Sequence, residues 1–353
     1  MNAMLVLLTM MATTAIDNIP FYADKHELLQ YQDNAGAMVP ITDAAGWAVR
    51  RAHALAGMQS VMGALPTGDR SAPPAYEIVE TVSFPAYTRH TIRYVTEAWD
   101  VTPAFLFIPK NATSPRPAML CLHPTSPLGK RIVAGEGEKP NRNYAQELAE
   151  RGYVVLAPDY PGFGDYVETR KRLYEEGYVS CTMKGIWNHL RGVDLLERLA
   201  GVDGERIGCI GHSLGGHNAL FLSAFDPRIK VTVTSCGFTT FAKYMEGDLT
   251  GWTHDGYMPR IASVYDKDPA RMPFDFTEIL GSIAPRAVFI NAPVNDDNFE
   301  VSGVRDAVAA AEKVFALYEA GAWLRVVYPD AGHDFPDPCR EQAYDFIGEV
   351  LRQ

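Results

Sequence analysis

From residue 115 onward, short apolar runs alternate with segments of helical period, and this alternation constrains the fold more than any other feature of the sequence. The runs cover residues 118–123, 153–158, 207–211, 231–235, 287–291 and 324–328. Apolar runs of this length are typical of strands buried on both faces, and the helices between them supply the crossovers that parallel strands need. The sequence therefore predicts an α/β fold with a mostly parallel central sheet and helices on both of its faces.

The helical segments carry apolar side chains on one face. In residues 182–199, Met183, Ile186 and Leu190 fall on one stripe, and a second segment, residues 340–351, closes the chain. Spacings of three and four residues place such side chains on the same side of a helix. We expect both helices to pack that side on the sheet.

The first hundred residues have a different pattern. Residues 43–65 have helical spacing and end at Gly63 and Pro66, which predicts a helix with one buried face. Runs of β-forming residues at 77–84, 91–95 and 104–108 follow and predict an antiparallel entry to the sheet.

No long linker separates these regions. We expect an α/β domain over residues 101–353 with an insertion at about 238–276, and an N-terminal extension, residues 16–100, that packs on it. Residues 1–15 form a further segment, in which apolar residues precede small ones as in an export signal. The segment lacks a basic start, and a later start codon or an ordered helix would explain it too. The pattern favours export over a cytoplasmic location.

Composition excludes several classes of protein. The formal net charge is −11, and no basic run could neutralise a phosphate backbone, which argues against nucleic acid as a partner. No later segment has the roughly 18 consecutive apolar residues of a membrane span. Cys121 and Cys209 lie within apolar strands, so the five cysteines predict buried thiols and not a disulfide framework.

The sequence Gly211-His-Ser213-Leu-Gly215 stands directly after a predicted strand and directly before a helical run. A serine in this context occupies a sharp turn with its hydroxyl exposed, and side chains at the two glycine positions would collide with the neighbouring backbone. Ser213 is therefore the candidate nucleophile. The alternative is a glycine-rich turn without catalysis.

A serine hydroxyl needs a base, and His333 follows the last predicted strand, where that base is expected. His212 and His217 flank Ser213, and we expect them to point along the strand and the helix instead of at the hydroxyl. His123 ends another strand at the same edge of the sheet and is a candidate for the wall of the substrate pocket.

An acid that orients the histidine is expected on the loop after strand 287–291. Asp296 is the first choice there, Asp297 is the alternative and Glu300 ranks third. Whichever aspartate is not the acid is expected to cap the helix that begins near Val301.

Two backbone amides are candidates for an oxyanion hole. The turn at Ser213 directs the Leu214 N–H and the helix N-terminus toward the serine hydroxyl. In the loop after strand 118–123, Pro124 has no N–H, which leaves Thr125 as the second donor. The alternative for this loop is a turn shaped only by proline.

Four stretches together carry a family resemblance: LCLHPTSPLGK, YAQELAERGYVVLAPDYPGFGDY, GHSLGGHNAL and GHDFP. With them, residues 90–350 resemble the α/β-hydrolase superfamily, especially its dienelactone hydrolase, acetyl xylan esterase and prolyl-oligopeptidase-like branches. The resemblance implies a Ser–Asp–His triad and hydrolysis through an acyl-enzyme. The sequence departs from that pattern at His123-Pro-Thr and at Asn291-Ala-Pro, before the oxyanion donor and before the acid.

The aromatic-rich segment between strands 231–235 and 287–291 offers Phe238, Trp252 and Tyr257 as pocket candidates, although plain packing would explain aromatic residues there. Three cations after the predicted oxyanion loop, Lys130, Arg131 and Arg142, would contact an acidic substrate or remain solvated.

The sequence contains no nucleotide, phosphate or zinc motif, so we predict neither a cofactor nor a metal. The leading hypothesis is a serine carboxylesterase acting on a small or carbohydrate-linked ester. Esters are favoured over peptides because about a hundred residues precede the core, too few for the propeller of large peptidases. The alternatives are a small serine peptidase or amidase and a catalytically silent binding protein.

Overall fold

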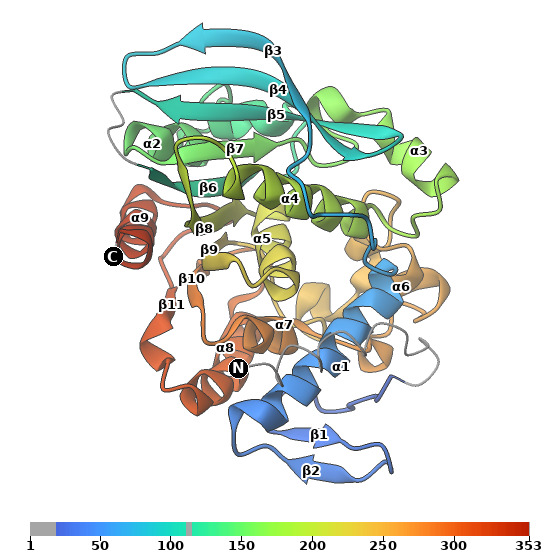
Figure 1. Cartoon of the computed structure of the whole chain (residues 1–353). Coiled ribbons are helices and arrows are strands. Elements are labelled where there is room, and N and C mark those ends of the chain that lie inside the picture. The colour runs from blue at the N-terminus through green and yellow to red at the C-terminus, as the bar shows by residue number, and fades with distance from the viewer. Residues whose placement is uncertain (1–18, 111–114, 353) are drawn as a thin grey trace, which may run out of the picture.

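The central element of the fold is one mixed β-sheet. The computed structural model describes residues 19–110 and 115–352. Nine strands of these residues form the sheet (Figure 1) in the order β11 (Leu324–Val327), β10 (Ala287–Asn291), β9 (Ile229–Ser235), β8 (Val202–His212), β6 (Arg116–Leu122), β7 (Val154–Pro158), β5 (Asp100–Pro109), β4 (Tyr87–Glu97) and β3 (Tyr76–Ser83).

From β11 to β7 the neighbouring strands are all parallel, whereas β7, β5, β4 and β3 pair antiparallel. Each apolar run that predicts a strand forms one, and β4 is longer than the run 91–95 indicates. The predicted mostly parallel sheet with an antiparallel entry is confirmed. In a parallel sheet the loops after the strands gather at one edge, which is where binding sites usually form.

Helices cover both faces of the sheet. The helices whose apolar residues share one core cluster include α4 (Cys181–Glu197), α5 (Leu214–Phe225), α7 (Phe276–Ile283) and α8 (Val301–Leu317). A second cluster, on the opposite face, includes residues of α2 (Tyr144–Glu150) and α9 (Asp337–Leu351). In Figure 1, α9 and α2 lie on the other side of the strands from α4, α5 and α7. The structure confirms helices on both faces.

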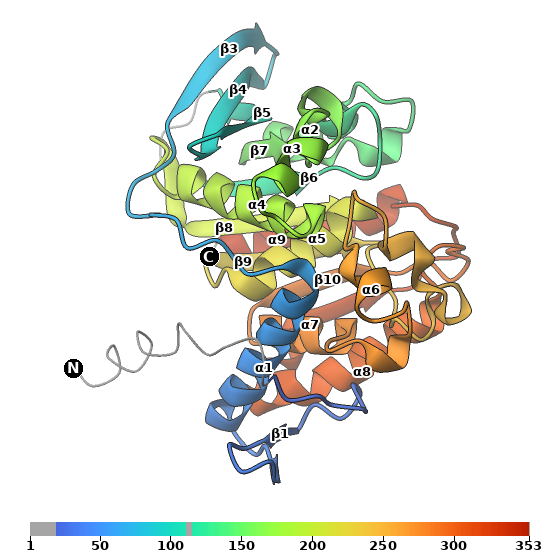
Figure 2. The ribbon, with the colours of Figure 1, turned by 90° about the vertical axis from the view of Figure 1, so that its right-hand side faces the viewer.

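The N-terminal helix α1 (Ala44–Met62) begins at Asp43, whose side chain accepts a hydrogen bond from the Gly46 N–H. The helix packs on α7 through a buried ion pair of 2.6 Å between Arg50 and Glu278. The chain then crosses the molecule to β3, at the far edge of the sheet (Figure 2). The extension therefore contacts two opposite regions of the structure.

A small antiparallel sheet of β1 (Gln30–Gln32) and β2 (Met38–Pro40) precedes α1. The sequence did not predict it, because strands of three residues are too short to show a period of two. The short helices elsewhere are η2 (Gly129–Ala134), η3 (Pro140–Arg142), η4 (Gly164–Tyr166), α3 (Thr169–Glu175) and η8 (Gly321–Trp323).

Between β9 and α7 the chain forms only short helices, namely η5 (Tyr244–Gly247), η6 (Leu249–Trp252), α6 (Arg260–Ser263) and η7 (Pro269–Arg271). This segment reaches the start of α4, where the Thr182 N–H donates to the Tyr257 carbonyl. It also reaches α3, since the Tyr174 hydroxyl donates to the Asp255 carbonyl. These contacts place it at the carboxyl edge of the parallel strands.

Two predictions concern targeting and membranes. The export segment, residues 1–15, lies outside the described residues. In the described part of the chain, no helix combines the length and the apolar character that crossing a membrane requires.

Candidate active site

Ser213 lies at the turn between β8 and α5 and has backbone angles φ 55° and ψ −118°, in the region that L-residues rarely occupy. The Ser213 N–H donates to the Ser235 carbonyl at 2.8 Å. A Cβ atom on Gly211 would lie 2.1 Å from the Gly215 carbonyl oxygen, and one on Gly215 would lie 2.0 Å from that of Leu122. Because neither backbone can recede, both positions require glycine, as the spacing of the motif predicts.

Two free amides lie near this turn. Among the hydrogen bonds of the described residues, the N–H groups of Leu214 and Thr125 take no part. Leu214 begins α5, so its N–H also lies at the positive end of the helix dipole. Thr125 is exposed, and its hydroxyl lies 3.4 Å from the Tyr257 hydroxyl.

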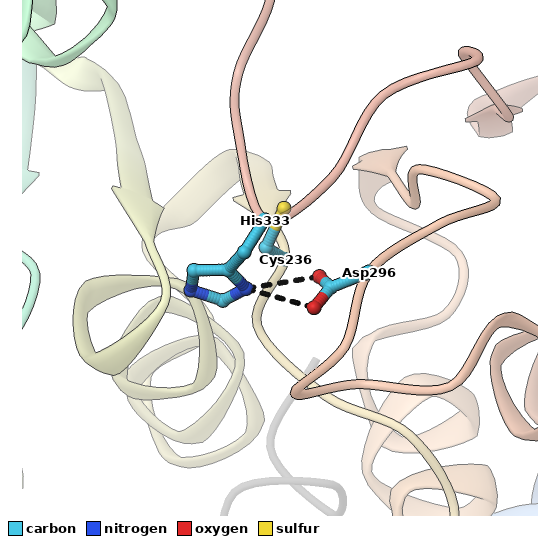
Figure 3. Close-up of side chains that lie close together, drawn as sticks. All are labelled: Cys236, Asp296 and His333. Carbon is cyan, nitrogen blue, oxygen red and sulfur yellow. Dashed lines mark hydrogen bonds and ion pairs between the residues drawn. The ribbon is translucent and has the colours of Figure 1, made fainter.

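The Asp296 carboxylate and the His333 imidazole form a direct pair (Figure 3). They lie on the loops after β10 and β11, and Nδ1 of His333 is 2.9 Å and 3.0 Å from the two carboxylate oxygens. The Asp296 carboxylate also accepts the N–H groups of Asn298 and Phe299. Burial opposes its ionisation, but the His333 hydrogen bond and these amides lower the pKa of Asp296 below its usual value.

The two neighbouring acids, Asp297 and Glu300, do not pair with His333 in the described structure. Asp297 is exposed and makes no hydrogen bond to His333 in the described structure. The Glu300 side chain accepts from the Ser302 and Gly303 N–H groups and caps α8. The cap of this helix is therefore Glu300, and the expectation that Asp297 caps it was wrong.

The loop that carries His333 is held by Arg142. Its guanidinium lies 2.6 Å from the Asp334 carboxylate and donates to the His333 carbonyl at 3.2 Å. Asn141 also donates to Asp334, at 2.6 Å. Arg142 is 3% exposed, so the prediction that it contacts an acidic substrate was wrong. Its side chain instead supports the histidine loop.

The other two cations are also engaged. Lys130 is fully buried, and its ammonium lies 2.6 Å from both Asp159 and Asp165. Arg131 pairs with Asp165 at 3.0 Å. Because these contacts neutralise the cations, the suggestion that they meet an acidic substrate does not hold.

The remaining histidines near Ser213 are buried. Nδ1 of His212 lies 2.9 Å from the Ser235 hydroxyl, and burial lowers the pKa of His212 well below its usual value. The His212 ring is 4.9 Å from that of His333, which brings the histidine loop beside the Ser213 turn. Nδ1 of His217 faces the Gly237 carbonyl, and burial lowers its pKa to about 3. Both stay neutral within the fold.

The pocket candidates divide into core and surface. Phe238 and Trp252 are 2% and 3% exposed and pack against Phe276. They therefore belong to the core, and the prediction that they line the pocket was wrong. His123 is also buried; its Nε2 accepts the Tyr160 N–H and its Nδ1 faces the Pro124 carbonyl. His123 nevertheless lines a small cavity together with Leu214 and Gly215. Tyr257 is partly exposed beside Thr125, so both remain candidates for the pocket wall.

Cys236 also lies at this site, and the sequence analysis did not select it. It directly follows β9, and its sulfur lies within 4.8 Å of the ligand atoms of Asp296 and His333. Its place after a parallel strand is the one signal that could have indicated it. All five cysteines are buried and free, as the prediction of no disulfide framework requires.

Comparisons with known proteins agree with this fold. The matching family model is that of fungal glucuronyl esterases, over residues 171–319. YtaP of Bacillus subtilis (strain 168), whose name assigns it only to the hydrolases, is 30% identical over 261 residues, which cover 70% of this chain and 83% of YtaP. The carbohydrate esterase MZ0003, from an unknown prokaryotic organism, is 25% identical over 266 residues, 68% of this chain and 57% of that protein.

Solved structures are similar over nearly the whole chain. A glucuronoyl esterase from Solibacter usitatus has a TM-score of 0.68 at 19% identity, covering 94% of this chain and 99% of that one. A CE15 glucuronoyl esterase from Teredinibacter turnerae T7901 has a TM-score of 0.68 at 18% identity, covering 95% and 90%. The chain belongs to the α/β-hydrolase superfamily, as the resemblance of its motifs predicts.

Proposed function

We propose that this protein hydrolyses carbohydrate esters through an acyl-enzyme on Ser213, with His333 as general base and Asp296 as the acid that orients it. The observation that carries the proposal is the Asp296–His333 pair, on loops that meet at the edge of the sheet where Ser213 is partly exposed. Of the nine histidines, His333 alone in the described structure has a carboxylate at hydrogen-bonding distance from a ring nitrogen, and its side chain is partly exposed to solvent.

The first half of the reaction forms the acyl-enzyme. The Ser213 oxygen attacks the ester carbonyl carbon while Nε2 of His333 takes the hydroxyl proton. The carbonyl electron pair moves to the oxygen, and the Leu214 and Thr125 N–H groups donate to that oxyanion. When the intermediate collapses, the C–O bond to the alcohol breaks and His333 returns the proton to the leaving alkoxide.

The second half releases the acid. A water molecule gives its proton to His333 and attacks the acyl carbon, and the Ser213 oxygen leaves and regains the proton. Asp296, with its lowered pKa, remains ionised throughout and stabilises the imidazolium that forms twice in each cycle.

The substrate class rests on the relatives. A fungal glucuronyl esterase model covers residues 171–319, a segment that includes Ser213 and Asp296. Similar solved structures include glucuronoyl esterases and an acetyl xylan esterase. We therefore propose a small-molecule or oligosaccharide ester as substrate, with esters of uronic acids as the first class to test.

A fluorophosphonate probe tests the nucleophile. Wild-type protein should be labelled at Ser213, as located by mass spectrometry, and His333→Ala should not be labelled because the serine then lacks its base. Ser213→Ala serves as the control for labelling elsewhere. Failure of the folded wild type to react would count against the catalytic assignment and favour a silent binding protein.

Matched substrates test the reaction class. We expect turnover of a glucuronic acid methyl ester and of an acetylated xylo-oligosaccharide, and at most slow turnover of amides with the same acyl groups. Faster cleavage of the amides would overturn the esterase proposal in favour of an amidase. Turnover of simple aryl acetates alone would contradict the carbohydrate substrate.

A further inference from the structure

Three side chains that differ in chemistry meet at one point of the structure. The Cys236 thiol, the Asp296 carboxylate and the His333 imidazole, here called the thiol cluster, follow the adjacent strands β9, β10 and β11. Their candidate ligand atoms all lie within 4.8 Å of one another. Ester hydrolysis by a serine, a histidine and an aspartate does not require a thiol, so the function leaves Cys236 unexplained.

The backbone fixes the thiol in this position. Cys236 has φ 47°, in the left-handed region, and its N–H donates to the Asn291 carbonyl at 2.9 Å. Its sulfur also lies 3.2 Å from the Asp334 carbonyl, in the loop that carries His333. These contacts hold the sulfur within 4.8 Å of the candidate ligand atoms of the other two members, with its S–H directed at the Asp334 carbonyl.

The donor set selects a class of metal ion. One sulfur, one nitrogen and one oxygen donor suit zinc and the more thiophilic cadmium, whereas magnesium and calcium prefer oxygen alone. Around tetrahedral zinc, neighbouring ligand atoms lie roughly 3.4 Å apart. His333 Nδ1 and Asp296 are 2.9 Å apart, so a small rotation of the imidazole would open enough room.

Access to the cluster is one-sided. Cys236 and Asp296 are buried, whereas the His333 side chain is 25% exposed and provides the entry path. The remaining coordination position would hold water, as at zinc sites with three protein ligands.

We infer that the thiol cluster binds one thiophilic divalent cation, such as Zn²⁺ or Cd²⁺, and that this binding inhibits the enzyme. Coordination breaks the S–H bond of Cys236, whose proton passes to solvent, and the single ring proton of neutral His333 moves from Nδ1 to Nε2 by exchange with solvent. The metal then bonds to sulfur, Nδ1 and the carboxylate. Inhibition rests on the proposed function: Asp296 leaves the imidazole, and the single proton of His333 now occupies Nε2, so His333 cannot accept the proton of Ser213.

Cadmium binding tests the site without reference to activity. Titration of the full-length, metal-free protein should give the ultraviolet absorption of a cadmium thiolate, saturating at one equivalent, with proton release measured in weakly buffered solution. Cys236→Ala should remove the absorption and weaken cadmium binding by at least about 100-fold, because a direct ligand is lost. Cys339→Ala, which removes a buried thiol in α9, should behave as wild type.

Inhibition is measured separately on an ester substrate. Zn²⁺ should inhibit the wild type, EDTA should restore turnover, and Cys236→Ala should be insensitive; Cys236→Ser serves if the alanine variant does not fold. Equal cadmium absorption in wild type and folded Cys236 variants would overturn the site. Stoichiometric cadmium binding at Cys236 with undiminished ester hydrolysis would instead overturn the role of His333 and Asp296 in the proposed function.

Discussion

The two sides of the proposed active site are built by different forces. The serine side consists of β8, α5 and the turn between them, where Gly211 and Gly215 are in backbone contact and no side chain fits. The histidine side consists of two loops held by polar contacts, above all Asp296 with His333 and Arg142 with Asp334. The serine side is fixed by excluded volume and the histidine side by charge. Different substitutions and changes of pH should therefore disrupt the two sides.

The largest effect is expected at Gly215. A Cβ atom there would lie 2.0 Å from the Leu122 carbonyl oxygen, a contact that neither strand nor helix can relieve. We expect Gly215→Ala to lower the free energy of unfolding by more than about 3 kcal/mol, measured by urea denaturation. Gly321→Ala, where a Cβ meets nothing within 4 Å, is the matched control. A fully stable Gly215→Ala protein would refute the steric account.

The second effect separates chemistry from stability on the histidine side. Asp296→Asn should lower kcat by about 10⁴-fold, because the imidazole loses the group that fixes its tautomer and stabilises its positive charge. Asp297→Asn, a change in the adjacent exposed carboxylate, should leave kcat within about twofold, since surface changes are usually small in effect. If steady-state kinetics gave equal losses in both variants, the choice of Asp296 would be wrong.

A smaller effect is expected at Arg142. Arg142→Ala removes the support of the His333 loop and should lower kcat by roughly 10- to 100-fold through misplacement of the imidazole. The labelling rate of Ser213 by a fluorophosphonate should fall with it. Arg325→Ala, which breaks an exposed pair with Glu349, should change neither kcat nor the midpoint of thermal unfolding measurably. An unchanged kcat in Arg142→Ala would show that the His333 loop keeps its position without Arg142.

The smallest effect is a pH dependence of local order. Burial opposes ionisation of Asp334, but hydrogen bonds from Arg142 and Asn141 lower its pKa, and the pKa of Asp296 is also lowered. A carboxylate whose folded pKa is lowered stabilises the fold above its unfolded value, near 3.8, and loses that contribution as pH falls further.

Hydrogen-exchange protection factors measure this difference. On going from pH 5 to pH 3, peptides covering residues 329–336 should lose protection before those covering 208–218, because the serine turn is held by packing. Simultaneous loss in both peptides would show that the two sides open as one unit.

The same contrast explains what the sequence could predict. The serine turn could be predicted from the sequence because its requirement is local: two glycines, a strand before them and a helix after them within ten residues. The strands were accessible because burial on both faces leaves a run of apolar residues. His333 followed from chain order alone.

The contacts on the histidine side could not be predicted from local sequence in the same way. Asp296 and Asp297 are adjacent in one loop, and only the folded loop turns one inward and leaves the other exposed. Arg142 and Asp334 are 192 positions apart, and nothing local distinguishes a cation that supports a loop from one that meets a substrate. The sequence predicts Phe238 and Trp252 as pocket residues, but the structure buries both side chains. Their burial depends on how the aromatic segment packs, which the local sequence does not show.

The five buried thiols offer a practical consequence. They lie in β6, α4, β8, the turn after β9 and α9, and none is bonded to another. A thiol reagent can reach each one only when the structure around it opens, and the frequency of such openings depends on the local free energy of unfolding. Timed alkylation read by mass spectrometry would therefore yield a map of native-state fluctuations at five positions, with no engineered probe.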